Sequence, residues 1–147
     1  MPQRLPALAF GALAGLLMAV QGTLNTQLSR TIGRVEATLV IQTIGLLSAG
    51  FLLFPLRLGT GDLGQLRQAP WYTLLGGVLG VAIVFTVVAA MTRLGIATAT
   101  TAILVAQILT AAAIDHFGLF GAECRPFAWF KLLGVALLAA GARLLLS

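Results

Sequence analysis

Charge is scarce in this chain. Only 9% of its 147 residues are Asp, Glu, Lys or Arg, whereas a soluble domain carries about 25%. So few charges cannot cover a water-facing surface, and this shortage argues against an ordinary soluble globular protein. Because 59% of the residues are apolar, the sequence instead predicts a protein that lipid surrounds.

Cysteine and histidine occur once each, as Cys124 and His116. One cysteine excludes an intrachain disulfide, and the pair is too small for an intrachain zinc site. No glycine-rich nucleotide loop follows a strand-like segment. We therefore expect no metal, no cofactor and no catalytic residues. An intramembrane enzyme is the weakest alternative, because His116 ends a predicted span and Ser48 has no evident base partner.

The net charge of +5 comes from nine Lys and Arg residues against four acids. These cations stand one or two at a time between apolar runs, without the basic stripe and interleaved aromatics of a nucleic-acid surface. We therefore expect no nucleic-acid partner. Cations that flank apolar segments are typical of contacts with lipid headgroups.

Uncharged apolar runs divide the chain into five segments. A helix needs roughly 20 apolar residues to cross a hydrocarbon core of about 30 Å. Four runs satisfy this, and the fifth contains Lys131, whose long stem can extend toward the interface. The runs are continuously apolar rather than alternating, which argues against strands. The sequence predicts an all-α polytopic membrane helix bundle, one integral membrane domain over residues 1–147, with transmembrane helices near 5–29, 36–58, 70–92, 95–115 and 126–146.

The first of these segments also resembles a signal peptide, because Arg4 precedes an apolar stretch. Its uncharged run continues to Ser29, which is too long for a typical signal peptide, and no small-x-small cleavage site closes it. We therefore interpret it as the first membrane helix.

The basic residues are divided almost equally between the two predicted sides of the membrane. Cytoplasmic loops normally carry the excess of Lys and Arg, so this chain has almost no orientation signal. Either one orientation is chosen by another signal, or the chain inserts both ways and pairs as an antiparallel homodimer. The N-terminal side has Arg4, Arg57, Arg67, Arg125 and Lys131, and the other side has Arg30, Arg34, Arg93 and Arg143.

Two pairs of glycines recur at helical spacing, Gly11 with Gly15 and Gly76 with Gly80. Small residues four apart let helix backbones approach closely in lipid. These faces therefore predict helix packing, either within one chain or along the seam of a homodimer.

Four amide side chains lie inside the predicted spans, where polar groups are costly and informative. Gln21 and Asn25 are four residues apart on one helix face, and Gln42 and Gln107 lie within the second and fourth spans. Gln21 and Gln42 are at similar depth and could bond to each other as interhelical glue, worth roughly 1 kcal/mol. Alternatively, all four amides line a substrate path.

The acidic residues lie at the ends of predicted spans. Glu36 begins the second span, and Asp115 ends the fourth, directly before His116. Asp115 and His116 are either a solvated helix end or a proton-handling pair. No carboxylate lies at mid-membrane, where a proton-coupled transporter usually needs one.

Several stretches resemble the YdcZ-like family of inner-membrane exporters, grouped with the drug/metabolite transporter superfamily. The resemblance covers essentially the whole chain, and the Asp-His-Phe-Gly segment after a membrane glutamine is its most specific part. It is carried by Gln21–Leu28, Trp71–Gly80, Ala106–Leu119, Lys131–Val135 and Gly141.

This resemblance implies five helices, a multi-pass location in a bacterial inner membrane, and transport as a homodimer or as a paired half-transporter. The chain departs from the family pattern at Ala106, where glycine is usual, and at Thr92, where proline often stands. The first change affects packing near Gln107, and the second affects the end of the third span.

Our leading hypothesis is a small transporter subunit that exports a small polar or amphipathic solute by alternating access, with the amides lining the path. The rival hypothesis is a non-transporting membrane partner that stabilises or regulates a larger complex. In that case the glycine faces, rather than the amides, would be sensitive to substitution.

Overall fold

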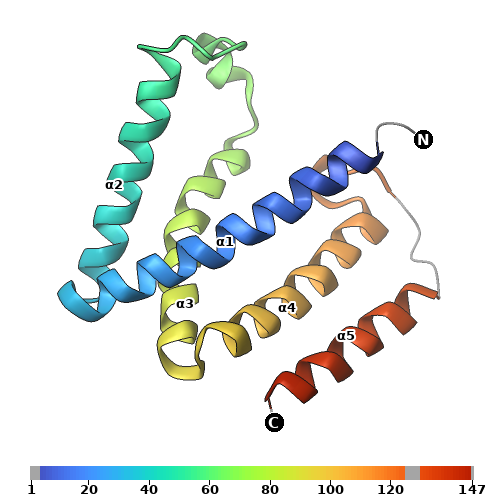
Figure 1. Ribbon diagram of the computed structural model, residues 1–147. Coiled ribbons are helices and arrows are strands. Elements are labelled where there is room, and N and C mark those ends of the chain that lie inside the picture. The colour runs from blue at the N-terminus through green and yellow to red at the C-terminus, as the bar shows by residue number, and fades with distance from the viewer. Residues whose placement is uncertain (1–3, 125–129, 147) are drawn as a thin grey trace. The chain divides into compact units, whose positions relative to one another are not determined.

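The computed structural model describes residues 4–124 and 130–146, and the described chain is built from helices (Figure 1). The predicted all-α class is confirmed. The long helices are α1 (Arg4–Ile32), α2 (Arg34–Leu53), α3 (Leu75–Leu94), α4 (Ile96–Phe117) and α5 (Phe130–Leu146). Three short 3-10 helices connect them: η1 (Leu63–Gln68), η2 (Trp71–Leu74) and η3 (Leu119–Gly121).

Helices of membrane-spanning length and composition account for the first four predicted spans. Within the described residues, four candidates meet both criteria: Leu5–Ile32, Arg34–Leu53, Trp71–Leu94 and Ile96–Phe117. The fifth predicted span corresponds to α5, which is 17 residues long and therefore about 26 Å at 1.5 Å per residue. The protein is a polytopic membrane protein made of helices.

The helix ends differ from the predicted spans where local chemistry stops a helix. α2 ends at Leu53 rather than near residue 58, because Pro55 has no N–H for an i→i−4 hydrogen bond and its ring obstructs the preceding turn. The third span begins with the 3-10 turn η2, and regular α-helix starts only at Leu75. Residues 126–129 of the last predicted span lie outside the described residues.

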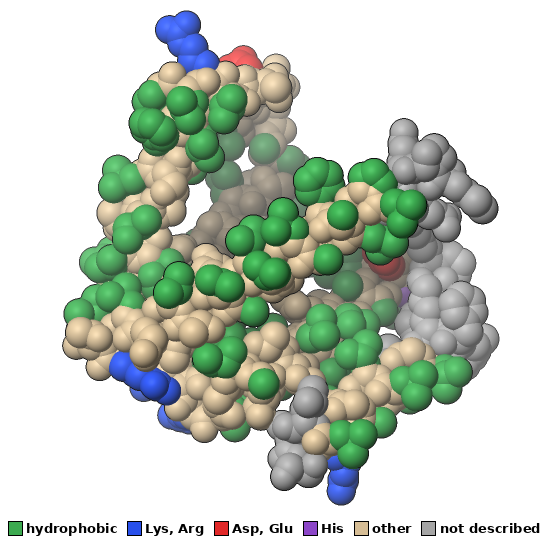
Figure 2. Space-filling view, viewed as in Figure 1, with side chains coloured by type: hydrophobic (Ala, Val, Ile, Leu, Met, Phe, Trp, Pro, Cys, Tyr) green, Lys and Arg blue, Asp and Glu red, His purple; other side chains and the backbone are tan. Residues whose placement is uncertain are grey.

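The described helices expose large apolar side chains instead of burying them. Leu8, Phe10, Leu39, Leu46 and Val78 are each about two-thirds exposed or more. Figure 2 shows these hydrophobic side chains spread over the helix surfaces, with basic side chains gathered at helix ends. Such a surface is unstable in water and suits a hydrocarbon solvent.

The chain divides into two compact units, residues 1–89 and residues 90–147. In the first unit α1 packs against α2, and in the second α4 packs against α5 (Figure 1). The buried residues of the first unit include Thr26 and Ser29 near the end of α1 and Ala37 and Thr38 near the start of α2. The buried residues of this unit therefore gather at the α1–α2 junction, and Val88 of α3 is buried as well.

A single glycine forms the junction between α1 and α2, and another joins α3 to α4. Gly33 has φ 97° and ψ 158°, and Gly95 has φ 82° and ψ 166°. Each glycine N–H closes the preceding helix, bonding to Ser29 O at 3.0 Å and to Met91 O at 3.1 Å. Each glycine carbonyl then accepts the first hydrogen bond of the next helix. One residue at positive φ thus joins the two helices while both of its own backbone groups stay hydrogen-bonded.

Replacing Gly33 or Gly95 by Ala is expected to destabilise the protein by about 1–2 kcal/mol, because a β-carbon is strained at positive φ. At Gly33 the new methyl group would also collide with the Glu36 carboxylate. Thermal unfolding in detergent would measure the effect. Gly11→Ala is the control, since it lies inside α1, meets no neighbour among the described residues and favours the helix. Equal melting temperatures for all three variants would contradict the assigned junction geometry.

Candidate functional site

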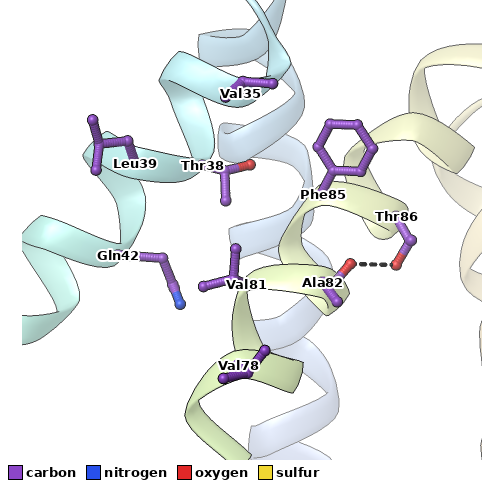
Figure 3. A pocket seen from close by; sticks show the side chains of 9 residues that line it. All are labelled: Val35, Thr38, Leu39, Gln42, Val78, Val81, Ala82, Phe85 and Thr86. Carbon is purple, nitrogen blue, oxygen red and sulfur yellow. Dashed lines mark hydrogen bonds between the residues drawn. The ribbon is translucent and has the colours of Figure 1, made fainter.

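A cavity of about 600 Å³ lies between α2 and α3 in the first unit. Figure 3 shows the lining side chains of the two helices facing each other across it. Ligand pockets typically have volumes of about 300–1,000 Å³ and mainly apolar walls. The lining residues are Val35, Thr38, Leu39 and Gln42 of α2 and Val78, Val81, Ala82, Phe85 and Thr86 of α3.

Three lining side chains are polar, but two of them are already satisfied. Thr38 Oγ1 donates to Arg34 O at 2.8 Å, and Thr86 Oγ1 donates to Ala82 O at 2.8 Å. Both bonds return to the residue's own helix, as is usual for hydroxyls in membrane helices. Gln42 makes no hydrogen bond to any described residue. The Gln42 amide is therefore unpaired in the described chain, and its Nε2 atom lies next to Gly80, which does not line the cavity.

The Gln42 side chain extends to α3 beside Gly80. A β-carbon at Gly80 would lie 3.6 Å from Gln42 Nε2, so the half-buried amide extends from α2 toward the α3 backbone. Gly80 was predicted as a packing glycine for two helices. Here its nearest cross-helix neighbour is the Gln42 amide, at an ordinary van der Waals distance from where a β-carbon would lie.

A cation contacts the lining residue Phe85 but does not itself line the cavity. The Arg34 Cζ atom stands 5.7 Å from the centroid of the Phe85 ring, within the range of a cation–π contact. Arg34 forms no ion pair with any described residue. The sequence suggested neither the Phe85 contact nor the cavity, because both depend on how α2 faces α3.

The amides of α1 lie apart from the cavity wall. Asn25 is half-buried and Gln21 is exposed, and neither lines the cavity. In the described chain no hydrogen bond joins Gln21 to Gln42, so the interhelical-glue interpretation gains no support. Gln107 lies on α4 in the second unit and is exposed. The proposed substrate path through all four amides therefore stays a prediction.

Two buried hydroxyls lack partners within the described residues. Thr26 is 4% exposed, and its Oγ1 atom makes no hydrogen bond. The Oγ1 atom of Thr100 is also buried and makes no hydrogen bond. Other threonines bond to the carbonyl four residues earlier, as Thr23 does to Ala19 O at 2.9 Å. Thr26 lies within the motif that closes α1, although sequence reasoning did not single it out.

Asp115 and His116 lie in the last turn of α4. Asp115 is half-buried and His116 is exposed, with its ring 4.9 Å from that of Phe117 in an edge-to-face contact. The His116 carbonyl accepts a hydrogen bond from Cys124 Sγ at 3.2 Å. Gly118, at φ 61°, then ends the helix. Proton handling by this pair stays a prediction.

The predicted packing glycines are open to their surroundings. A β-carbon at Gly11, Gly15 or Gly76 would meet no atom within 4 Å among the described residues. Within the described chain these three glycines therefore have no packing partner. A homodimer seam at these positions remains a prediction.

The family comparison covers nearly the whole chain. The family model described as "Putative inner membrane exporter, YdcZ" matches residues 6–144. Inner membrane protein YdcZ of Escherichia coli (strain K12) is 27% identical over 140 residues, which cover 92% of this chain and 91% of that protein. No solved structure shows a significant match.

The match agrees with the helices and with the motifs noted in the sequence. It includes the motif that closes α1 and the Asp-His-Phe-Gly segment that ends α4. The predicted inner-membrane, multi-pass location is confirmed by the family and by the apolar helices. This chain belongs to the YdcZ family of inner-membrane exporters.

Proposed function

We propose that this protein exports a small amphipathic solute and that the cavity between α2 and α3 is part of its binding site. Family membership supports membrane transport in general. The cavity with its almost wholly apolar surface, beside the unpaired amide of Gln42, is the observation that carries the proposal. Such a wall binds a solute with a hydrocarbon or aromatic body, and one amide fixes its orientation through a hydrogen bond.

The proposal involves transport without covalent chemistry. Binding requires the solute to leave water, and the apolar wall favours this transfer by roughly 25 cal/mol per Å² of apolar surface. The amide contributes on the order of 1 kcal/mol through its hydrogen bond. An export cycle needs binding of this modest strength, because a solute held too tightly is not released.

Alternating access by a homodimer is the mechanism we propose for the movement itself. The open glycine positions at Gly11, Gly15 and Gly76 suit close contact with a second copy. Rocking of helices about the cavity would then expose it to each side of the membrane in turn. The two copies are either parallel or antiparallel.

The Gln42→Ala variant is expected to reduce export by about three- to tenfold, which corresponds to the loss of one hydrogen bond of about 1 kcal/mol. Export is measured by mass spectrometry of solutes in the medium of cells that produce the wild-type protein, the variant or neither. Gln65→Ala is the matched control, because this amide lies in η1 outside the cavity.

Equal export by wild-type and Gln42→Ala cells would remove the cavity from the mechanism. No protein-dependent solute at all, together with stoichiometric copurification of an unrelated membrane protein, would favour the non-transporting partner over a transporter.

A further inference from the structure

We propose that an acyl chain of a membrane phospholipid occupies the cavity between α2 and α3 when no solute is bound, with the lipid phosphate at Arg34. This occupant comes from the bilayer itself and goes beyond the proposed function. Only its displacement by a solute rests on that function. Three observations of the first unit support the site: an apolar lining, lining side chains that are exposed to lipid, and a cation in contact with one lining residue.

The lining of the cavity offers water little to bind. The Thr38 and Thr86 hydroxyls donate to carbonyls of their own helices, and Gln42 Nε2 lies next to Gly80, which is outside the lining. The other lining side chains are hydrocarbon. A cavity with apolar walls stays dry and accepts apolar ligands. Within a bilayer the hydrocarbon that is always available is a lipid acyl chain.

The cavity is not closed off from the lipid around the helices. Val35 and Leu39 of α2 and Val78 of α3 line it, and each of them is also largely exposed. Figure 3 shows side chains of α2 and α3 bordering the space from two sides. An acyl chain can therefore enter sideways from the bilayer while the two helices keep their positions, and a solute can displace it.

The length of the lining suits a chain segment within one leaflet. The lining residues extend from Val35 to Gln42 on α2 and from Val78 to Thr86 on α3, which is about 10–12 Å along a helix axis. One leaflet contributes about 15 Å, half of a hydrocarbon core of roughly 30 Å. Because α2 begins at Arg34, the lining extends from the end of this span toward its middle, as an acyl chain does.

A cation lies beside the cavity, outside its apolar lining, where a lipid needs one for its phosphate. Arg34 is exposed, its Cζ atom is 5.7 Å from the centroid of the Phe85 ring, and Phe85 lines the cavity. Arg34 makes no ion pair with a described residue, and the Glu36 carboxylate lies against Gly33 instead. Guanidinium groups bind phosphate oxygens bidentately, and basic residues between membrane helices bind anionic headgroups.

A helix of a second copy is a poorer occupant of this cavity. Membrane helices approach each other most closely where glycine lies on the shared face, and no glycine is among the described lining residues. The glycines with open surroundings, Gly11, Gly15 and Gly76, lie outside the lining. Contact between two copies through these glycines would therefore leave the cavity to lipid.

Photoreactive lipid tests the site in the full-length protein. The protein is placed in vesicles of phosphatidylglycerol that contain a small fraction of the same lipid with a diazirine on one acyl chain, and the labelled residues are mapped by mass spectrometry. We expect the lining residues to be labelled more strongly than Ile44 and Leu47, which are exposed on α2 outside the lining. Equal labelling would show that the cavity holds no preferred chain and would overturn the proposal.

Two pairs of variants separate the acyl chain from the phosphate. Ala82→Phe fills the cavity and should remove the preferential labelling, whereas Ile83→Phe, outside the lining, should preserve it. Arg34→Gln should lower the phosphatidylglycerol retained by the purified protein by about fivefold, the effect of one cation on an anionic headgroup. Arg30→Gln is the matched control, because Arg30 is an exposed cation at the end of α1. Equal losses in the two arginine variants would overturn the assignment of the phosphate to Arg34.

A single thiol in the cavity tests for a second copy as the occupant. Val81→Cys is made in a Cys124→Ser background, so that the chain has one cysteine. We expect no disulfide between copies in vesicles under oxidising conditions. Efficient disulfide formation would place a second copy at the cavity and would overturn the lipid site.

The lipid site and the proposed function fail separately. If lipid labels the cavity but Ala82→Phe exports normally, the lipid site stands and the proposed function is wrong. If Ala82→Phe stops export but labelling does not distinguish the lining from Ile44 and Leu47, the transport role stands and the lipid site is wrong.

Discussion

Replacing Ala82 by Phe is expected to lower export at least tenfold while the protein still inserts and folds. Ala82 lines the cavity on α3, and its carbonyl accepts the Thr86 hydroxyl at 2.8 Å. A phenyl ring at this position would fill space that the solute needs. The cost is large because the solute loses contact along much of its apolar body, and each CH₂ left unburied forfeits about 0.8 kcal/mol.

Folding should survive this substitution because the ring enters a cavity and not a packed core. Overpacking costs about 1–3 kcal/mol only where neighbouring side chains leave no space. Ile83→Phe is the matched control, since Ile83 is the next residue on α3, is 55% exposed and does not line the cavity. Export and thermal stability are measured together. Normal export by Ala82→Phe would show that the solute crosses elsewhere.

The second large effect is expected at Gln107, where Ala should abolish export without lowering stability. Gln107 is exposed on α4 within an apolar span, and it has no hydrogen bond to a described residue. An amide facing hydrocarbon without a partner costs roughly 2–7 kcal/mol. Its partner in the working protein is therefore expected to be the solute, water in the transport path or a second copy of the chain.

Thr110→Val on the same helix is the control for this variant. The Thr110 hydroxyl donates to Ala106 O at 2.8 Å, so its removal should leave export unchanged. Thermal unfolding and chemical crosslinking would report stability and assembly of both variants beside export. If Gln107→Ala exports normally, the residue faces lipid at a depth that water reaches, and it has no place in the path.

The positions of the helices could be predicted closely because a helix that spans hydrocarbon depends mainly on its own apolar residues. A run of about 20 apolar residues is sufficient for a spanning helix whatever its neighbours do, and backbone hydrogen bonds inside lipid must be made within the helix itself. Four predicted spans accordingly have counterparts of spanning length and composition in the described structure. Hydropathy did not locate the end of α2. Pro55 ends the helix by removing a backbone hydrogen bond, and this effect does not change the hydropathy of the segment.

The sequence did not show which glycines form the helix junctions. Gly33 and Gly95 are two of 17 glycines in the chain, and composition does not separate them from glycines inside helices. Their positive φ angles arise where one helix must stop and the next begin within a single residue. The sequence pattern located the connectors, and the backbone geometry identified these two glycines as the residues that form them.

The amide at Gln42 was noticed in the sequence because polar groups inside a span are rare. That reasoning could not separate it from Gln21, Asn25 and Gln107. Gln42 differs from them because it is among the lining residues of the cavity, with α3 opposite it. Arg34 likewise was counted only as a flanking cation until its contact with Phe85 was seen.

Composition and hydropathy by themselves determined that this protein is a set of apolar helices in a membrane, since each span depends on its own residues and on lipid. The motifs along the chain determined its family. The tertiary structure alone decided that a cavity lies between α2 and α3, that the unpaired Gln42 side chain is among its lining residues and that Arg34 contacts the lining residue Phe85. These properties require residues about 40 to 50 positions apart in the chain to lie near one another, and no local rule of hydrophobicity or helix geometry encodes such a pairing.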